Sequence, residues 1–473
     1  MSAVPLRLFN TRTREIAAFV PRNPPAVGMY TCGPTVYAYA HIGNMRAYVF
    51  SDTLRRTLRW KGFDVRQVMN ITDVGHLTSD EDEGDDKLEL AAQREQRNIW
   101  EIAEHYTRAF KEDLAALRIL EPDVWCKATD HIAEMVTFAE GLDVNGWCYT
   151  LPSGLYFDTA KDDDYGALAR LDLAGQQEGA RVETVEGKRN PSDFAVWRTS
   201  SPDEHRQMEW DSPWGRGAPG WHLECSVMSI RYLGEHFDIH TGGVDHIPVH
   251  HTNEIAQSEA FLDDGEPWVD WWLHGEFINL RSAKISKSAG DSLRATELEG
   301  HHPLVYRYLL LQAHYRSQVE FSWEAMDSAR TGLRRLVDRY ASARTAPVAL
   351  GAAARAHLDA FDAAISDDLN TARALAAVAA ASRDDAVSDG ELSALAAEFD
   401  AVLALGLSDL TATDLDVKTG DVSDDEVDAL VAERDAARAA KDFARSDELR
   451  DKLAAMGVTV EDHAGAASTW RWT

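Results

Sequence analysis

The order of apolar and polar positions near the N-terminus predicts a strand, a helix and a second strand. Residues 27–31 form a short apolar run typical of a strand, and apolar residues then recur at helical spacing through 47–58. Lys61 and Gly62 end the helical pattern, and 65–71 is a second strand-like run. We therefore expect a βαβ unit with two parallel strands.

The turn after the first predicted strand carries polar residues just before the helix. They include His41, Gly43 and Asn44. In open parallel sheets, ligands lie at the carboxyl ends of the strands, and the free amides of a helix N-terminus favour phosphate. These three residues are therefore predicted to lie beside a nucleotide.

The pattern changes several times further along the chain. A helical run covers 88–117, short apolar pieces separated by turns follow it, and a second βα pattern surrounds 237–240. From 301 onward the periodicity is helical, with Ala-rich faces suited to close packing, apart from an acidic linker at 411–424. We expect an α/β protein: a split Rossmann-like nucleotide-binding domain with an α+β insertion, then an all-α helical bundle and a small C-terminal module. The predicted parts are the first half of the nucleotide-binding domain (1–118), the insertion (119–205), the second half (206–300), the bundle (301–410), the linker (411–424) and the C-terminal hairpin with its tail (425–473).

Composition and charge limit the setting of the protein. No run approaches the roughly 20 apolar residues of a membrane span, and the start of the chain does not resemble a signal peptide, so we expect a soluble cytoplasmic protein without a membrane partner. The formal net charge is −31, and acidic residues occur in nearly every segment. A uniformly acidic surface suits a high-salt cytoplasm, where the screening length falls to roughly 3 Å at 1 M salt. The alternative is a polyanion that avoids nucleic acid, unless local Arg clusters overrule the net charge.

The four cysteines are too few and too scattered for a disulfide framework, which fits a reducing compartment. Cys32 and Cys225 gain interest from His250 and Glu254, whose spacing of four places both side chains on one face of a helix. Together these four offer ligands suited to tetrahedral zinc. Isolated cysteines are more often small buried hydrophobes, and neighbouring histidines compete for the ligand role, so spacing alone does not decide. The competitors are His246 and His251, and the cysteines without a predicted role are Cys126 and Cys148.

Two further stretches suit phosphate and ribose. Lys284, Lys287 and Ser288 lie in the sequence KISKS, which suits a clamp on a triphosphate, although an isolated basic loop is more often solvated surface. Asp245 follows a pair of glycines after the second predicted strand; an acid there can accept a hydrogen bond from ribose, and a plain turn is an equal alternative.

The order HIGN, GWHLEC, HTGGVDH with HHTNE, and KISKS resembles the class I aminoacyl-tRNA synthetases, and in detail the cysteinyl-tRNA synthetases, over nearly the whole chain. The resemblance implies an enzyme that ligates L-cysteine to the 3′ end of its tRNA through a cysteinyl-adenylate, using ATP and releasing AMP and pyrophosphate. It also implies one zinc ion per chain, Mg²⁺ with ATP, and a monomer. Asn44 stands where the family signature has a second His, and Ile285 where it has Met.

The resemblance also implies roles for individual residues. The implied zinc ligands are Cys32, Cys225, His250 and Glu254. The implied catalytic residues are His41, Asn44, Lys284 and Lys287, and ATP would also contact Gly43, Asp245 and Ser288. The cysteine pocket would include Thr72 and Trp221, and the anticodon would meet Arg438, Lys441 and Phe443.

Two other functions share part of this pattern. A cysteine ligase that joins cysteine to an amino sugar resembles the same catalytic core, but such enzymes are shorter and lack the C-terminal module. A non-catalytic tRNA-binding protein descended from a synthetase is the other alternative, which the intact HIGN and KISKS motifs disfavour. The acidic loop 75–86 is longer than the family's short form, and the sequence predicts no role for it.

Overall fold

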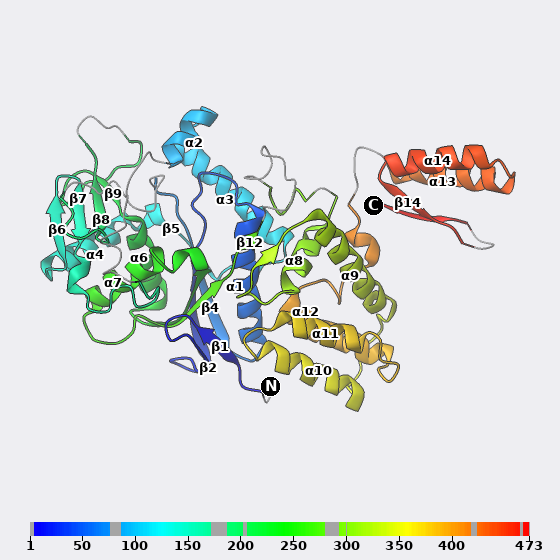
Figure 1. Ribbon diagram of the computed structural model, residues 1–473, viewed down its shortest axis with the longest axis horizontal. Helices are drawn as coiled ribbons and strands as arrows, with labels where there is room; N and C mark the ends of the chain where they lie inside the picture. The colour runs from blue at the N-terminus through cyan, green and yellow to red at the C-terminus, as the bar shows by residue number, and fades with distance from the viewer. Residues whose placement is uncertain are drawn as a thin grey trace.

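Five parallel strands form the central sheet of the protein, seen edge-on in Figure 1. The computed structural model describes residues 4–75, 87–171, 187–201, 206–279, 293–298, 300–417, 423–463 and 467–472. Within those ranges, no helix is both long and apolar enough to cross a membrane. The strand order is β11, β10, β3, β4, β5. Their bounds are β3 (Ala26–Thr31), β4 (Asp64–Ile71), β5 (Val124–Lys127), β10 (Phe237–Gly243) and β11 (Val269–Gly275).

The strand order changes direction between β3 and β10. From β3 the chain adds β4 and β5 on one side, and β10 with β11 completes the other side. In such sheets the crevice outside the carboxyl ends of the strands at this point is the ligand site. The split nucleotide-binding fold expected from the sequence is confirmed.

Helix α1 (Ile42–Trp60) connects β3 to β4 and completes the predicted βαβ unit. Its apolar side is fully buried, with Leu54 and Leu58 at 0% exposure, because these residues recur on one face of the helix. The helix ends at Lys61, and Gly62 has a φ of 93°, which favours glycine. The helix begins five residues earlier than the apolar periodicity suggests, with His41 at its N-cap.

The helical run at 88–117 is two helices, α2 (Lys87–Glu95) and α3 (Ile99–Ala116). Gln96 has a φ of 54°, which ends α2, and the Asn98 side chain accepts a hydrogen bond from the Glu101 amide and starts α3.

A four-stranded antiparallel sheet forms the insertion, at the left end of the molecule in Figure 1. Its elements are β6 (Cys148–Leu151), β7 (Gly154–Phe157), β8 (Phe194–Thr199) and β9 (Gly217–Pro219), with α4 (Ile132–Val144) beside them. Helix α6 (Trp221–Leu233) packs against β3 and β4 of the central sheet and against β8 of the insertion. Helix α7 (His250–Leu262) packs on α6 and α4. The two helices therefore lie where the insertion meets the central sheet.

The second half of the chain is helical, as predicted. The helices of the bundle are α8 (Pro303–Leu311), α9 (Trp323–Ser342), α10 (Ala352–Ile365), α11 (Thr371–Ala381) and α12 (Asp389–Leu403). Helix α12 packs on α1, so the bundle shares one apolar core with the nucleotide-binding domain. The start of the predicted linker is a short 3-10 turn, Ala412–Leu415, that packs on α9 and buries Leu415.

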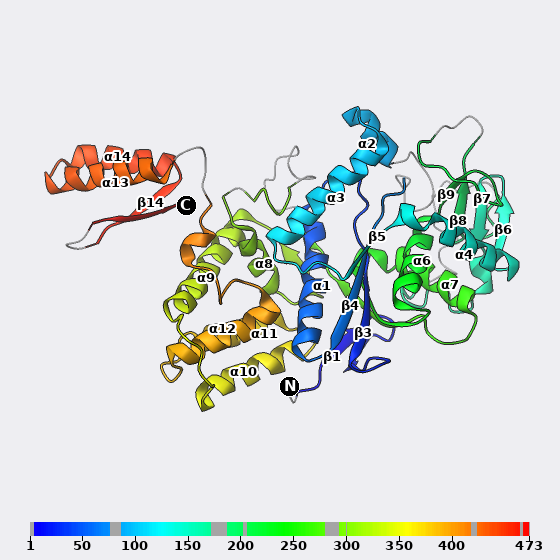
Figure 2. The same cartoon turned by 180° about the vertical axis from the view of Figure 1, so that it is seen from behind.

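A small unit with its own apolar core ends the chain. It contains α13 (Asp424–Ala439), α14 (Phe443–Ala455) and a hairpin of β14 (Val458–Glu461) with β15 (Thr469–Trp472). Figures 1 and 2 show this unit at the opposite end of the molecule from the insertion. Two short two-stranded sheets complete the fold. They pair β1 (Arg7–Asn10) with β2 (Glu15–Ala18), and β12 (Ile278–Asn279) with β13 (Val319–Glu320).

Candidate active site

A cavity of about 630 Å³ opens at the carboxyl ends of β3 and β10. This is the size of a typical small-molecule site. The residues predicted from the sequence that line it are Cys32, His41, Gly43, Asn44, Thr72, Trp221, Cys225, Asp245 and His250. Lys284, Lys287 and Ser288 lie outside the described residues, as does nearly all of the acidic loop 75–86.

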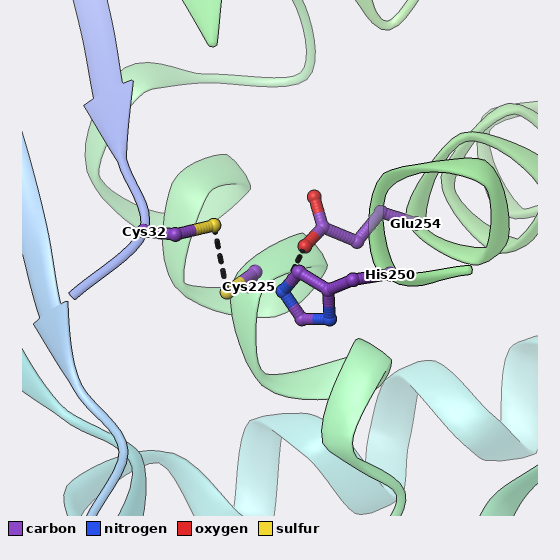
Figure 3. Close-up of side chains that lie close together, drawn as sticks. All are labelled: Cys32, Cys225, His250 and Glu254. Atoms are coloured by element: carbon purple, nitrogen blue, oxygen red, sulfur yellow. Dashed lines mark hydrogen bonds and ion pairs between the residues drawn. The ribbon is translucent and has the colours of Figure 1, made fainter. Parts of the chain in front are cut away.

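The predicted metal ligands lie together in the structure, although they come from three separate segments. Cys32 directly follows β3, Cys225 lies on α6, and His250 and Glu254 lie one turn apart on α7, as Figure 3 shows. The Cys32 and Cys225 sulfur atoms are 4.0 Å apart, and His250 Nε2 is 2.6 Å from Glu254 Oε1. One donor atom from each residue lies within 4.8 Å of all the others, and all four side chains are buried. Two thiols, an imidazole and a carboxylate at this separation fit a tetrahedral zinc ion.

A second set of four overlaps the first. It keeps Cys32 and Glu254 but replaces the other two ligands by His240 and His251, again within 4.8 Å. Cys225 and His250 line the cavity, whereas His240 and His251 are absent from the described residues that do so. Three members of the first set therefore line the cavity, against Cys32 alone in the second.

The protonation of the cluster also suits a metal. Burial alone would raise the pKa of the Cys32 thiol, but hydrogen bonding to Cys225 and the charge of His251 hold that pKa well below its usual value. Burial and the hydrogen bond with Cys32 raise the pKa of Cys225. Burial lowers the pKa of His250, but the Glu254 carboxylate outweighs it and raises that pKa to about 10. A metal would displace the protons on Cys225 and His250.

More buried histidines stand behind the ligands. His240 Nε2 lies 2.8 Å from Glu254 Oε2, His251 Nδ1 lies 2.7 Å from His274 Nε2, and the Nδ1 atoms of His222 and His250 are 3.1 Å apart. From the sequence, His251 is predicted only as a competing ligand, and no role is predicted for His222, His240 or His274. The density of histidines between 240 and 251 is a signal, but spacing does not distinguish ligands from their supports.

The start of α1 forms the other end of the cavity. The His41 amide donates to Asn44 Oδ1 at 3.1 Å, so Asn44 holds the turn that precedes the helix. A Cβ atom on Gly43 would lie 2.7 Å from the His41 ring, so a larger residue there would push the ring away from the first turn. The Ile42 amide donates to the carbonyl of Leu293, the first described residue after the KISKS segment.

The paired glycines of β10 make room for protein side chains. A Cβ on Gly242 would lie 2.7 Å from both His246 and His251, and one on Gly243 would lie 2.2 Å from Asp245 Oδ1. From the sequence, the acid after these glycines is predicted to contact ribose. The glycines lie at the end of β10 and line the cavity, and the space beside them also holds imidazole and carboxylate groups of the chain.

Thr72 and Trp221 lie beside the predicted ligands on the cavity wall. The Trp221 ring stacks on His250, with centroids 4.2 Å apart. The Thr72 hydroxyl donates to Glu224 Oε2 at 3.1 Å and accepts from Asn70 Nδ2 at 3.0 Å. Glu224 and Asn70 were not singled out in the sequence, where each is one of many unremarkable polar residues.

The predicted anticodon residues lie in the C-terminal unit, away from the cavity. Phe443 is the first residue of α14 and is 66% exposed. Lys441 lies in the turn between the helices with a φ of 61°, and Arg438 forms an ion pair with Asp462.

Two family descriptions match this chain. The tRNA synthetases class I (C) catalytic domain matches residues 18–331, and the cysteinyl-tRNA ligase anticodon binding domain matches residues 421–471. The chain is 52% identical to a cysteine–tRNA ligase of Novosphingobium aromaticivorans, over 99% of this chain and 97% of that one. It is 51% identical to cysteine–tRNA ligase 1 of Burkholderia lata, over 97% of this chain and 95% of that one.

The fold is also similar to a solved structure. The structure of Mycobacterium tuberculosis methionyl-tRNA synthetase in complex with methionyl-adenylate superposes with a TM-score of 0.55 at 16% identity, over 80% of this chain and 88% of that one. The likeness supports the class I fold. Both family descriptions match the chain, and a relative that is 52% identical aligns over 99% of it. The chain therefore belongs to the cysteinyl-tRNA synthetases, a family of class I aminoacyl-tRNA synthetases.

Proposed function

We propose that the cavity at the ends of β3 and β10 is where this cysteine–tRNA ligase forms cysteinyl-adenylate from L-cysteine and ATP. The observation that carries the proposal is that three of the four predicted metal ligands (Cys32, Cys225 and His250), the predicted cysteine pocket and the HIGN turn line one cavity. The alternative, ligation of cysteine to an amino sugar, is disfavoured by the anticodon-binding match at 421–471.

The amino acid would bind at the Cys32 end of the cavity. Cys32, Cys225, His250 and Glu254 would hold the zinc ion; the second ligand set, of which only Cys32 lines the cavity, is the weaker candidate. When bound, zinc supplies a ligand position for the substrate thiolate, which serine and alanine lack. An apolar pocket separates side chains that differ by one small group by only about 1–3 kcal/mol. Thr72 and Trp221 would close the pocket around the bound amino acid.

ATP would bind at the His41 end. His41, Gly43 and Asn44 surround the first turn of α1, whose free amides favour phosphate. Asp245 would accept a hydrogen bond from the ribose, and Lys284, Lys287 and Ser288 would contact the phosphates together with Mg²⁺. This proposal rests on the family motif for the KISKS residues.

In the reaction, the cysteine carboxylate attacks the α-phosphorus of ATP, and the bond to pyrophosphate breaks. Lys284 and Lys287 would stabilise the charge on the leaving pyrophosphate, while His41 and Asn44 would hold the phosphates in line. The terminal ribose hydroxyl of tRNA then attacks the adenylate carbonyl, and AMP leaves. Neither step requires a covalent bond to the protein.

Replacement of Cys225 by Ser tests the assignment. Cys225→Ser should lose bound zinc and cysteine-dependent exchange of pyrophosphate into ATP. Cys126→Ser is the matched control, because Cys126 is also a buried thiol but lies outside both ligand sets. A Cys225→Ser protein that keeps its zinc and its exchange rate contradicts the proposal.

The C-terminal unit would read the anticodon, with Phe443 stacking on a base and Arg438 and Lys441 near the backbone. The domain limits predicted from the sequence patterns remain proposals, except at the insertion. β5 (Val124–Lys127) falls inside 119–205 but pairs with β4 of the central sheet, and β9 (Gly217–Pro219) falls outside that range but pairs with β8 of the insertion.

The charge of −31 supports a high-salt cytoplasm as the setting, and we propose a monomer. Screening of like charges at high salt predicts that the melting temperature rises between about 0.05 and 1 M KCl. A melting temperature that falls over this range contradicts the salt proposal, and a dimer mass in light scattering contradicts the monomer.

A further inference from the structure

A row of hydrogen bonds runs beside the proposed cysteine pocket. The Gly33 amide donates to Asn70 Oδ1 at 2.7 Å, Asn70 Nδ2 donates to Thr72 Oγ1 at 3.0 Å, and the Thr72 hydroxyl donates to Glu224 Oε2 at 3.1 Å. Gly33, Asn70 and Thr72 line the cavity, and Glu224 is fully buried behind them. The row begins one residue after the proposed ligand Cys32.

The direction of each hydrogen bond is fixed by its ends. A backbone amide only donates, so the Asn70 side chain must turn its oxygen to Gly33 and its amino group to Thr72. At the other end, the Thr72 hydroxyl donates to Glu224 Oε2, a carboxylate oxygen that accepts. A Cβ on Gly33 would lie 1.6 Å from the Asn70 carbonyl oxygen, so only glycine allows this close approach.

This row of hydrogen bonds determines whether the Thr72 hydroxyl can donate to a substrate or accept from it. A hydroxyl has one proton and two lone pairs. Glu224 takes the proton and Asn70 takes one lone pair, which leaves one lone pair of Thr72 Oγ1 and no donor. Of the two charged groups at the α-carbon of an amino acid, the ammonium only donates and the carboxylate only accepts. Thr72 is therefore matched to the ammonium and mismatched to the carboxylate.

A second buried carboxylate nearby has its partners elsewhere. Asp73 Oδ1 accepts from the Thr129 amide at 2.9 Å, and Asp73 Oδ2 accepts from the Thr129 hydroxyl at 2.7 Å. Among the described residues, Asp73 is not part of the cavity lining, and both of its carboxylate oxygens are directed to Thr129. Glu224 is thus the carboxylate that orients the Thr72 hydroxyl.

We infer that Glu224 is a positioning residue for substrate selection: it holds Thr72 as an acceptor, so that the pocket prefers thiols that carry an α-ammonium. The inference rests on the proposed function, since it assigns the ammonium end of the same pocket.

Three thiol ligands distinguish the contribution of the ammonium to binding from those of the thiol and the carboxylate. L-cysteine has the thiol, ammonium and carboxylate; cysteamine lacks the carboxylate, and 3-mercaptopropionate lacks the ammonium. Binding of each to the full-length zinc-loaded protein would be measured by calorimetry, with zinc content determined in parallel. In Glu224→Gln, cysteine and cysteamine should bind about 10-fold more weakly, the loss expected from one hydrogen bond to a charged group. Binding of 3-mercaptopropionate should change less than twofold.

Two further variants make the test specific. Asp73→Asn is the matched control, which removes a buried carboxylate without touching Thr72 and should leave the ratio of cysteine to 3-mercaptopropionate affinity unchanged. Thr72→Val should remove the preference for the ammonium, and Thr72→Ser should restore it. Because Glu224 acts through Thr72, Glu224→Gln should change the ratio little further in the Thr72→Val protein.

The outcomes that overturn the inference are distinct from those that overturn the function. If Glu224→Gln weakens all three thiols equally, or changes none of them, Glu224 does not select the ammonium. If the unmodified protein with zinc fails to bind cysteine and to exchange pyrophosphate, the proposed function itself fails.

Discussion

His240 Nε2 lies 2.8 Å from Glu254 Oε2, and both side chains are fully buried. The contact fixes the Glu254 carboxylate, whose other oxygen faces His250. Partners of metal ligands typically change metal affinity by about 10–100-fold when removed. We predict that His240→Leu weakens zinc binding by about that factor, measured by competition with a chelating dye.

The surface pair of His236 and Asp264, also 2.8 Å apart, provides the control for that variant. His236→Leu removes an imidazole from a carboxylate far from the ligand set and should leave zinc affinity unchanged. Equal zinc affinity in the His240→Leu and unmodified proteins contradicts a supporting role for His240.

Removal of zinc should change which cysteines react. Cys32 and Cys225 line the cavity, whereas burial raises the pKa of Cys126 and of Cys148, and both are absent from the described cavity lining. We predict that iodoacetamide modifies Cys32 first after chelation, because its pKa is held low, and that zinc protects it. Peptide mass spectrometry gives the order of modification. Faster modification of Cys126 or Cys148 in the folded protein would contradict this order.

The zinc-ligand candidates show which parts of the site can be predicted from residue spacing. The spacing of four between His250 and Glu254 on a helix was sufficient to place them on one face. Spacing did not separate His250 from His251, because adjacent helical residues both approach a site at the helix end. The distinction depends on Cys225, because Cys32 belongs to both ligand sets. Cys225 is 193 residues from Cys32 and approaches it through the packing of α6 on β3.

Asp113 of α3 fastens the described residues that follow the KISKS segment. Asp113 Oδ2 accepts from Arg294 Nε at 3.1 Å, and Oδ1 accepts from the Thr296 hydroxyl at 2.9 Å. Asp113→Asn turns an amino group toward Arg294 and should slow pyrophosphate exchange about 10-fold, with cysteine affinity unchanged. Asp409→Asn, in an exposed pair with Arg118, is the control and should have little effect. An unchanged exchange rate in Asp113→Asn would show that this anchor does not matter to the reaction.

The same carboxylate predicts a pH dependence. Burial raises the pKa of Asp113 above its usual value, against the opposing effect of Arg294 and Thr296. Above the folded-state pKa the stability difference between the unmodified protein and Asp113→Asn is constant. As pH falls toward the unfolded-state value of about 3.9, the folded unmodified protein takes up a proton first and gains stability relative to the variant. Urea unfolding between pH 7 and 4 measures the difference, and a change in the opposite direction contradicts the assignment.

A buried ion pair joins the bundle to the nucleotide-binding domain. Arg307 of α8 donates to Asp52 of α1 at 2.5 Å, with both side chains at 0% exposure, and also to the carbonyls of Leu117 and Leu403. Removal of Asp52 leaves the Arg307 charge buried without a carboxylate, which costs about 3–5 kcal/mol, whereas Asp52 keeps Arg56 at 2.8 Å when Arg307 is removed. Asp52→Asn should therefore lower the free energy of unfolding by about 3–5 kcal/mol, Arg307→Met by less, and the double variant by less than the sum of the two. Additive losses in urea titrations would contradict a direct pair.

The fold followed the sequence patterns closely where one face of an element is apolar, as along α1 and α9. It departed where a single backbone conformation decides. Gln96 breaks the run at 88–117 through a positive φ, which no apolar pattern records. The sequence did not predict Asn70 and Glu224 for a related reason. Their proposed role depends on the direction of two hydrogen bonds to Thr72, and that direction is set by contacts in three dimensions.

The exposed ring of Phe443 is predicted to contribute to tRNA charging and not to adenylate formation. Base stacking on an aromatic side chain contributes about 1–3 kcal/mol, so Phe443→Ala should lower kcat/KM for tRNA charging by roughly 5- to 150-fold. Because Phe443 lies in the C-terminal unit, away from the cavity, cysteine-dependent pyrophosphate exchange should not change. Trp100→Ala is the matched control, since Trp100 is an aromatic residue of α3 that is 49% exposed. Phe443→Trp should keep the stacking surface and the charging rate, whereas normal charging by Phe443→Ala would remove this residue from the anticodon site.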